Sequence, residues 1–252
     1  MGILRLGVIG WPLQHAASPH LWRHILRQAK ADDRLQYEKY SIPPAGLQDF
    51  MLRFRRDPTW YALNVTIPYK ERIISYLDAL TPEAQAIGAV NAICKCDGEV
   101  WGHNTDAMGF ERSVGRWWGW VKGRKALVFG TGGASRAVQY VLRKQGIPYV
   151  LISRNPSKGR WTYGDLMCAP RRLHPFGCLI NATPAGMIGH SPLRIPLNGL
   201  LPTHYCFDLV YAPALTPFLK MGLAVGAAVM NGSRMLWEQA LAAARWWRIL
   251  DQ

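Results

Sequence analysis

Short apolar runs alternate with segments of helical periodicity along this chain. Seven runs have the length and composition of strands, and they cover residues 4–9, 36–42, 61–65, 125–129, 149–153, 178–181 and 206–210. A capping residue followed by proline marks helix starts at Ser18-Pro19 and Thr81-Pro82, and Thr105-Asp106 places an acidic residue at a third start. This alternation predicts an α/β protein with helices covering parallel sheets.

Two segments combine tryptophan with arginine, RWWGW at 116–120 and RWW at 245–247. Such strings occur on nucleic-acid-binding surfaces, but their neighbours have the spacing of a buried helical stripe. The i, i+4, i+7, i+8 pattern comprises Phe110, Val114, Trp117 and Trp118, and the second segment has a similar helical spacing, i, i+4, i+7, i+11, with Leu236, Ala240, Ala243 and Trp247. We therefore interpret these tryptophans as core residues with solvated arginines beside them.

Composition indicates a folded globular protein with an unusual charge. The 252 residues are 49% hydrophobic, enough for one large domain or two small ones, and 30 Lys and Arg against 16 Asp and Glu give a net charge of +14. Such an excess attracts polyanions and small anionic ligands. The longest uncharged stretch, 173–193, contains three prolines, so we expect no membrane span, and without a leader peptide we expect a cytoplasmic protein.

Cysteine and histidine usage gives no sign of a metal site or a disulfide framework. The five cysteines include no CxxC pair, which favours reduced thiols. His20 and His24 lie one helical turn apart, but no third ligand is evident nearby. We predict that the protein binds no metal.

A glycine-rich turn lies between a predicted strand and a predicted helix. The strand at 125–129 is followed by GTGGASRA at 130–137, which is the arrangement of a dinucleotide-binding βαβ unit, although Ser135 stands where the strict pattern has a third glycine. No acidic residue occurs between Arg112 and Gly164, where an NAD site would need one. Arg154 and Lys158 instead suit a 2′-phosphate, so we predict NADP, against the alternative of a solvated basic turn.

Two further segments carry groups suited to proton transfer. NVTIPYKE at 64–71 follows a predicted strand and presents Thr66 and Lys70, and GHNTDAMGF at 102–110 presents Asp106 at a helix start. A lysine beside a carboxylate can exchange a proton with a hydroxyl as a hydride leaves. Spacing alone does not bring Lys70 and Asp106 together, and an isolated lysine is more often a surface residue.

The chain resembles the shikimate dehydrogenase family along nearly its whole length. Nine strings carry the resemblance, in the order found in that family: GWPLQHAASP (10–19), NVTIPYKE (64–71), GAVNAI (88–93), NTDAMGF (104–110), GTGGASRA (130–137), SRNPSK (153–158), NATPAGM (181–187), DLVYAP (208–213) and NGSRMLWEQ (231–239). Nine strings in order are far more specific than any one of them.

The resemblance implies an NADPH-dependent, reversible reduction of 3-dehydroshikimate to shikimate, with a role for each matching residue. Lys70 and Asp106 would be catalytic, and the substrate ligands would be Ser18, Thr66, Asn91, Tyr211 and Gln239. The cofactor would be bound by Gly130, Thr131, Gly132, Gly133, Ala134, Ser153, Arg154, Asn155, Lys158, Thr183, Leu209 and Gly232.

The family's architecture further implies two domains. An N-terminal α/β substrate domain would comprise residues 1–106 and 232–252, because the C-terminal helix returns to it, and a Rossmann-type NADP-binding domain would comprise 107–231. The expected partner is a small carboxylate substrate, with no nucleic acid and no membrane. Monomer and homodimer both remain open.

Two departures from the family leave the substrate open. Relatives usually read S-x-S-P where this chain has Ala16-Ala17-Ser18-Pro19, and Ala92 stands where threonine is common. Losing a hydroxyl at Ala16 predicts weak binding of shikimate, or another substrate such as quinate or an amino analogue. A further alternative is a non-catalytic NADP sensor whose basic surface binds nucleic acid.

Overall fold

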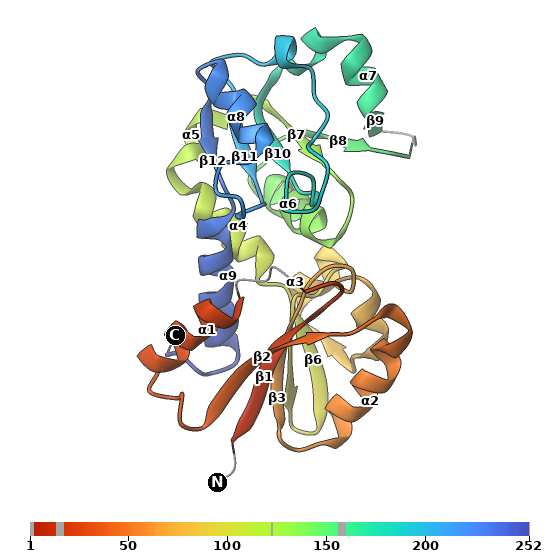
Figure 1. The fold of residues 1–252 in the computed structure, drawn as a ribbon, viewed down its shortest axis with the longest axis vertical. Helices are drawn as coiled ribbons and strands as arrows, with labels where there is room; N and C mark the ends of the chain where they lie inside the picture. Colours follow the sequence, from red (N-terminus) through yellow and green to blue (C-terminus); the bar gives the residue numbers. More distant parts are fainter. Residues whose placement is uncertain (1–2, 14–17, 122, 156–159, 252) are drawn as a thin grey trace. The chain divides into compact units, whose positions relative to one another are not determined.

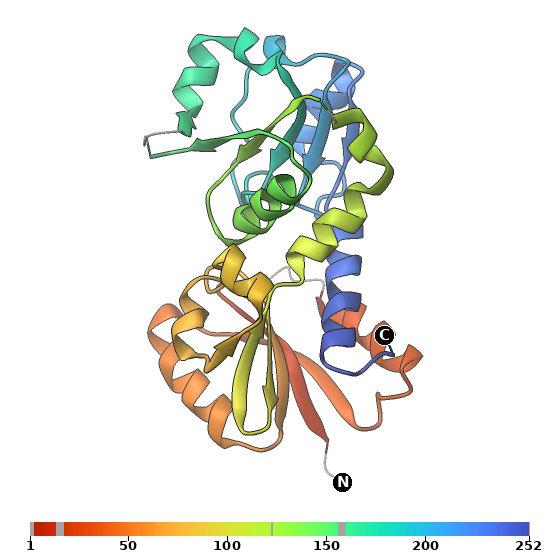
Figure 2. The same ribbon diagram turned by 180° about the vertical axis from the view of Figure 1, so that it is seen from behind.

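The chain folds into two compact units, each built on a six-stranded sheet (Figures 1 and 2). The computed structural model describes residues 3–13, 18–121, 123–155 and 160–251. The first unit comprises Met1–Gly109 and Trp237–Gln252, and the second comprises Phe110–Leu236. The described residues contain no helix with both the length and the apolar composition to cross a membrane.

The first unit has a mixed sheet in the order β2-β1-β3-β5-β6-β4. Its strands are β1 (Leu4–Gly10), β2 (Leu35–Ser41), β3 (Trp60–Val65), β4 (Ala79–Leu80), β5 (Ala92–Cys96) and β6 (Glu99–His103). Its helical segments are α1 (Ser18–Gln28), η1 (Pro44–Gly46), α2 (Leu47–Arg56), η2 (Arg72–Tyr76) and α3 (Pro82–Ile87). Strand β1 pairs in parallel with β2 and β3, whereas β5 is antiparallel to both of its neighbours.

Helices cover both faces of the first sheet because its strands alternate apolar side chains between the faces. On β3, Leu63 belongs to the core formed with α2 and α3, whereas Ala62 belongs to the core formed with α1 and the last helix. Figure 1 shows α1 and α2 on opposite sides of this sheet. Trp22 of α1 stacks on Trp247, with ring centroids 4.8 Å apart, so the end of the chain is part of this core.

The second unit has a fully parallel sheet in the order β12-β11-β10-β7-β8-β9. Its strands are β7 (Lys125–Phe129), β8 (Tyr149–Ser153), β9 (Arg160–Thr162), β10 (Phe176–Asn181), β11 (Tyr205–Asp208) and β12 (Ala228–Met230). The remaining helical segments are α4 (Asp106–Val114), η3 (Gly115–Trp117), α5 (Trp118–Val121), α6 (Gly133–Lys144), α7 (Tyr163–Cys168), η4 (Pro170–Leu173), η5 (Leu197–Gly199), α8 (Pro217–Ala224) and α9 (Ser233–Trp246). The chain leaves the first unit within α4 and re-enters it within α9.

The predicted α/β class is confirmed, and each of the seven predicted runs overlaps a strand, although the runs at 36–42 and 206–210 extend one and two residues past the strand ends. Thr81 caps α3 as predicted, because its side chain accepts a hydrogen bond from the backbone of Ala84. The β5–β6 hairpin was not predicted, although its turn, Asp97-Gly98, has positive φ at both residues (51° and 82°), as Asp-Gly turns prefer. This hairpin matters for the site, because Asn91 precedes β5 and Thr105 follows β6.

The predicted helical stripe from Phe110 to Trp118 is wrong in one respect. Helix α4 ends at Val114, and Gly115 has a φ of +45°, so Trp117 lies on a separate 3-10 turn. Phe110 and Val114 are buried, and Trp117 stacks on Tyr205 with centroids 4.8 Å apart. The aromatic rings therefore pack within the unit even though the helix is interrupted.

Candidate functional site

Lys70 and Asp106 form an ion pair in the first unit. Lys70 lies in the turn that follows β3, and Asp106 is the first residue of α4. The Lys70 Nζ lies 2.6 Å from Asp106 Oδ2, and the two side chains are only 15% and 6% exposed. The backbone carbonyl of Lys70 accepts a hydrogen bond from the amide of Val90, which ties this turn to the segment before β5. Two residues that are 36 positions apart in the sequence are thus joined by a charged hydrogen bond.

Asn91 holds the other oxygen of this carboxylate. Its side-chain amide lies 2.9 Å from Asp106 Oδ1, 2.9 Å from Thr105 Oγ1 and 3.2 Å from Gln239 Oε1. A side-chain amide has only two N–H donors, so these three acceptors compete for them. A polar ligand can therefore replace Thr105 or Gln239 as an acceptor while the hydrogen bond to Asp106 is kept. Asn91 is 3% exposed, which makes its hydrogen bonds strong and its orientation fixed.

Thr105 and Asn104 fix the start of α4 around Asn91. The Thr105 amide donates to Asn91 Oδ1 at 2.7 Å, and its hydroxyl donates to the same oxygen at 3.2 Å. The helix start predicted at Thr105-Asp106 is confirmed, because α4 begins at Asp106, and the Asn104 side chain caps this helix by accepting a hydrogen bond at its Oδ1 from the amide of Ala107. Both Asn104 and Thr105 are fully buried. Neither residue was predicted to belong to the site, although both lie in the NTD string at 104–106.

The other predicted substrate ligands lie on several elements. Gln239 of α9 reaches the Asn91 side chain, as described above, and also lies 3.4 Å from the Thr105 hydroxyl. Thr66 immediately follows β3, and its amide donates to the carbonyl of Ile9. Ser18 is the half-buried first residue of α1, and Tyr211 lies in the second unit after β11. Ala16, the departure from the family pattern, lies outside the described residues.

The glycine-rich turn of the second unit connects β7 to α6. Gly130 has a φ of +102°, and a Cβ there would lie 2.7 Å from the Thr183 side chain, so this position requires glycine. Thr131 follows, Gly132 precedes the first turn of α6, and Gly133 and Ala134 begin that helix. A Cβ at Gly132 would meet no atom within 4 Å, which leaves the helix N-terminus accessible to a ligand.

Ser135 replaces the third glycine of the usual pattern without disturbing the turn. Its side chain is fully buried, and its hydroxyl donates to the Gly130 carbonyl at 2.7 Å. It also accepts a hydrogen bond from Gln139 at 3.0 Å. The hydroxyl therefore cross-links the turn to the helix, a contact that glycine lacks.

The second strand of the βαβ unit ends at the predicted ribose-phosphate segment. Ser153 is buried at the end of β8, and its hydroxyl accepts from the amide of Asn155. Arg154 is exposed at the same end of the sheet as the glycine-rich turn, since the Gly130 amide donates to Ile152. Lys158 lies outside the described residues.

A buried polar network joins the ends of β10 and β11. Asn181 Oδ1 accepts from the amide and the hydroxyl of Thr183, at 3.0 and 2.6 Å, and Asn181 Nδ2 donates to Asp208 Oδ1 at 2.9 Å. The other oxygen of Asp208 accepts from the Thr216 hydroxyl at 2.6 Å. Asn181, Asp208 and Thr216 are fully buried. The network thus fixes the loop that carries Thr183.

Burial raises the pKa of Asp208 to about 6, although hydrogen bonds from Thr216, Val210 and Asn181 act in the opposite direction. Close packing fixes the adjoining segment, because a Cβ at Gly232 would lie 2.1 Å from the Leu209 carbonyl oxygen. Thr183, Leu209 and Gly232 therefore share one rigid region of the second unit. Asp208, Asn181 and Thr216 were not predicted as functional, and the position of Asp208 at a strand end was the signal.

The positive charge of the chain is concentrated in the second unit. Residues 110–236 contain 16 lysines and arginines but three acidic residues, a net charge of +13, whereas the first unit is nearly neutral. Of these three acids, Glu111 pairs with Lys144, Asp165 with Arg172, and Asp208 is buried. Across the described residues, no group of three or more His, Cys, Asp or Glu side chains could hold a metal ion.

Comparison with protein families and curated proteins gives one consistent result. The family model for the shikimate dehydrogenase substrate binding domain matches residues 8–93. The shikimate dehydrogenase (NADP(+)) of Rhodospirillum rubrum is 37% identical over 260 residues, covering 92% of this chain and 87% of that protein. The enzyme of the same name from Carboxydothermus hydrogenoformans is 34% identical, covering 95% of this chain and 90% of its own length.

Solved structures give the same result. Shikimate dehydrogenase from Aquifex aeolicus superposes with a TM-score of 0.88 at 29% identity, covering 99% of this chain and 94% of that one. Shikimate 5-dehydrogenase from Thermus thermophilus, solved in complex with NADP(H) and shikimate, has a TM-score of 0.84 at 32% identity, covering 98% and 94%. The similarity therefore extends over both units.

Proposed function

Because this chain belongs to the shikimate dehydrogenase family, we propose that it interconverts 3-dehydroshikimate and shikimate with NADP, using Lys70 and Asp106 for proton transfer. The observation that carries this proposal is the nearly buried Lys70–Asp106 pair, oriented by Asn91. The first unit, which contains the residues matched by the substrate-domain model, binds the substrate, and the second unit binds NADP. In the domain boundaries proposed from the sequence, these are residues 1–106 with 232–252, and 107–231.

On the substrate side, the polar groups suit a ring that carries hydroxyls and a carboxylate. Asn91 and Gln239 offer a donor and an acceptor within hydrogen-bonding distance of each other, and a substrate hydroxyl can bridge them. Thr66 and Ser18 carry hydroxyls for further contacts, and the family resemblance adds Tyr211 as a substrate ligand. Lys70 supplies the positive charge nearest to Asp106 in this cluster.

On the cofactor side, the residues present fit NADP. The accessible N-terminus of α6 suits the pyrophosphate, and the turn from Gly130 to Ala134 lets the backbone approach it closely. Arg154 suits the 2′-phosphate, together with Ser153, Asn155 and Lys158. Thr183, Leu209 and Gly232 lie in the rigid region at the ends of β10 and β11, which suits the nicotinamide end. When bound, NADPH supplies the hydride.

In the chemical step, Lys70 holds the proton that the substrate oxygen needs. As the carbonyl carbon of 3-dehydroshikimate is reduced, its oxygen takes a proton from the Lys70 ammonium group and becomes the hydroxyl of shikimate. Asp106 remains a carboxylate that orients Lys70 and accepts from the hydroxyl, and Asn91 keeps Asp106 in place. In the reverse direction, the Lys70 amine accepts the proton. A positioned proton donor of this kind contributes about 10²- to 10⁴-fold in rate.

Nicotinamide absorbance provides the test. Shikimate and quinate are each supplied with NADP⁺ and with NAD⁺, to the wild type and to Asp106→Asn. We expect the highest kcat/KM with shikimate and NADP⁺, and a loss of about 100-fold or more in kcat for Asp106→Asn. Faster turnover of quinate, a preference for NAD⁺, or an Asp106→Asn variant as active as the wild type would contradict the proposal.

A further inference from the structure

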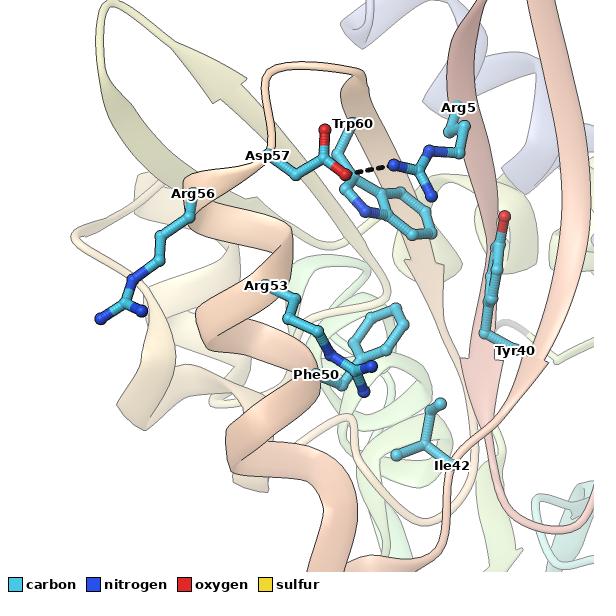
Figure 3. A pocket seen from close by; sticks show the side chains of 8 residues that line it. All are labelled: Arg5, Tyr40, Ile42, Phe50, Arg53, Arg56, Asp57 and Trp60. Carbon is cyan, nitrogen blue, oxygen red and sulfur yellow. Dashed lines mark hydrogen bonds and ion pairs between the residues drawn. The ribbon is translucent and has the colours of Figure 1, made fainter.

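A pocket of about 480 Å³ lies in the first unit between α2 and strands β1, β2 and β3 (Figure 3). Its lining residues are Arg5, Tyr40, Ile42, Phe50, Arg53, Arg56, Asp57 and Trp60. Lys70, Asp106, Asn91 and Gln239 do not line it, so it is distinct from the proposed catalytic cluster. A volume of this size is in the range of small-molecule sites.

The floor of this pocket is aromatic and rigid. Tyr40 packs edge-on against Trp60 with centroids 4.7 Å apart, and Phe50 packs edge-on against Trp60 at 5.5 Å. Phe50 and Trp60 are about 5% exposed, so the surface that a ligand can reach is formed mainly by Tyr40, Ile42 and the edges of these rings. Such a floor suits a flat or compact apolar body.

The charges at the rim favour a single negative charge. The Arg5 guanidinium lies over the Trp60 ring at 4.7 Å and is neutralised by its ion pair with Asp57. Arg53 extends beside Phe50 toward Ile42, whereas Arg56 points away from the pocket (Figure 3). Within the described part of the chain, Arg53 forms no ion pair. One available guanidinium, with the Asp57 carboxylate nearby, suits a monocarboxylate better than a dianion.

One wall of the pocket is hydrogen-bonded directly to the turn that carries Lys70. The Ile42 carbonyl accepts a hydrogen bond from the hydroxyl of Tyr69, which is fully buried and immediately precedes Lys70. The Ile42 amide donates to the carbonyl of Gly10 at 3.1 Å. A ligand that moves Ile42 therefore changes the support of the Lys70 turn.

We propose that this pocket binds a small aromatic monocarboxylate, with its carboxylate on Arg53 and its ring against Tyr40, Ile42 and Phe50, and that occupancy alters catalysis through the Ile42–Tyr69 hydrogen bond. The binding does not depend on the proposed function, and only its effect on catalysis rests on it. The site thus adds a regulatory ligand of defined chemistry to the substrate-binding unit.

The binding test uses benzoate, with neutral benzamide as its isostere, and saturation-transfer difference NMR on the full chain. We expect benzoate to bind at millimolar concentration, more tightly than benzamide, and to remain bound when shikimate is saturating. Arg53→Gln should weaken benzoate at least tenfold. Arg27→Gln, which removes an exposed charge from α1 on the other face of the sheet, should leave it unchanged. No binding, displacement by shikimate, or equal affinity in Arg53→Gln would overturn the site.

The coupling test is kinetic. Benzoate should change kcat/KM for 3-dehydroshikimate at least twofold in the wild type and in Arg27→Gln, but not in Arg53→Gln. Tyr69→Phe should still bind benzoate and yet lose most of this kinetic effect, because only the hydroxyl that contacts Ile42 is removed. Benzoate binding without any kinetic effect in the active wild type, or an undiminished effect in Tyr69→Phe, would overturn the coupling. An enzyme inactive with 3-dehydroshikimate refutes the proposed function instead.

Discussion

Replacing Asp208 by asparagine should make the protein's stability less sensitive to pH, in a direction that the structure specifies. Burial raises the pKa of this carboxyl from 3.8 to about 6. Between these values the folded state keeps a proton that the unfolded chain has released, so this group's contribution to the unfolding free energy falls as pH rises. The full loss is about 3 kcal/mol at neutral pH, of which about 2 kcal/mol develops between pH 4.5 and 7.5.

Asparagine removes the charge but keeps the hydrogen-bond geometry. Its Oδ1 can still accept from Asn181 and Val210, and its Nδ2 can donate to the Thr216 hydroxyl. We therefore expect the unfolding free energy of Asp208→Asn, relative to the wild type, to rise by about 2 kcal/mol from pH 4.5 to 7.5. His103 and His204, whose pKa burial lowers to about 4, titrate in both proteins and cancel in this difference.

Urea unfolding followed across this pH range measures the difference directly. Asp165→Asn is a control for which the opposite pH dependence is expected. Hydrogen bonds from Thr162 lower the pKa of Asp165, so the stabilisation that this carboxylate provides, and the stability lost on replacing it, should grow as pH rises. Asp208→Leu breaks the network that holds Thr183, and it should raise the KM for NADPH without raising that for 3-dehydroshikimate. If the unfolding free energies of the wild type and Asp208→Asn changed in parallel with pH, the raised pKa of Asp208 in the folded state would be contradicted.

Three further predictions concern the cofactor turn, the substrate carboxylate and the charge. Ser135→Ala removes the hydrogen bond to the Gly130 carbonyl, so it should lower the unfolding free energy by about 1 kcal/mol in urea titrations and raise the KM for NADPH. No change in either quantity would contradict the role of the hydroxyl. Ala16→Ser restores the hydroxyl found in relatives and should lower the KM for shikimate about tenfold, since a hydrogen bond to a charged group contributes roughly 1.5–3 kcal/mol. An unchanged KM would count against a hydrogen bond from this position to the substrate carboxylate. The KM for NADPH should rise more steeply with salt than that for 3-dehydroshikimate, because the second unit carries +13, and equal slopes would contradict electrostatic attraction of the cofactor.

The strands and helix starts were predictable because their signals are local. Strand β7 and helix α3 were located from an apolar run and from Thr81-Pro82, respectively. The break at Gly115 was missed because the apolar spacing continues through it, and the positive φ is not visible in a periodicity. The β5–β6 hairpin was missed although Asp97-Gly98 marked it, because its strands are short and contain polar residues.

The site was predictable only where the family strings identify residues. Lys70 and Asp106 were recognised as groups suited to proton transfer, and the resemblance gave them a shared role, but their contact depends on the fold bringing the turn after β3 next to the start of α4, which no local pattern specifies. Thr105 and Asp208 were missed as functional residues because their importance comes from the buried amides of Asn91 and Asn181, from other elements. Polar networks of this kind depend on tertiary geometry.

Oxidation of NADPH by 3-dehydroshikimate in Lys70→Ala is the most direct measurement, with Lys39→Ala, an exposed lysine on β2, as the matched control. If Lys70 provides the proton, kcat should fall about 100-fold or more in Lys70→Ala, while NADPH affinity measured by nucleotide fluorescence and the activity of Lys39→Ala stay at wild-type values. Equal kcat in Lys70→Ala and the wild type would contradict the proton-transfer role on which the account depends.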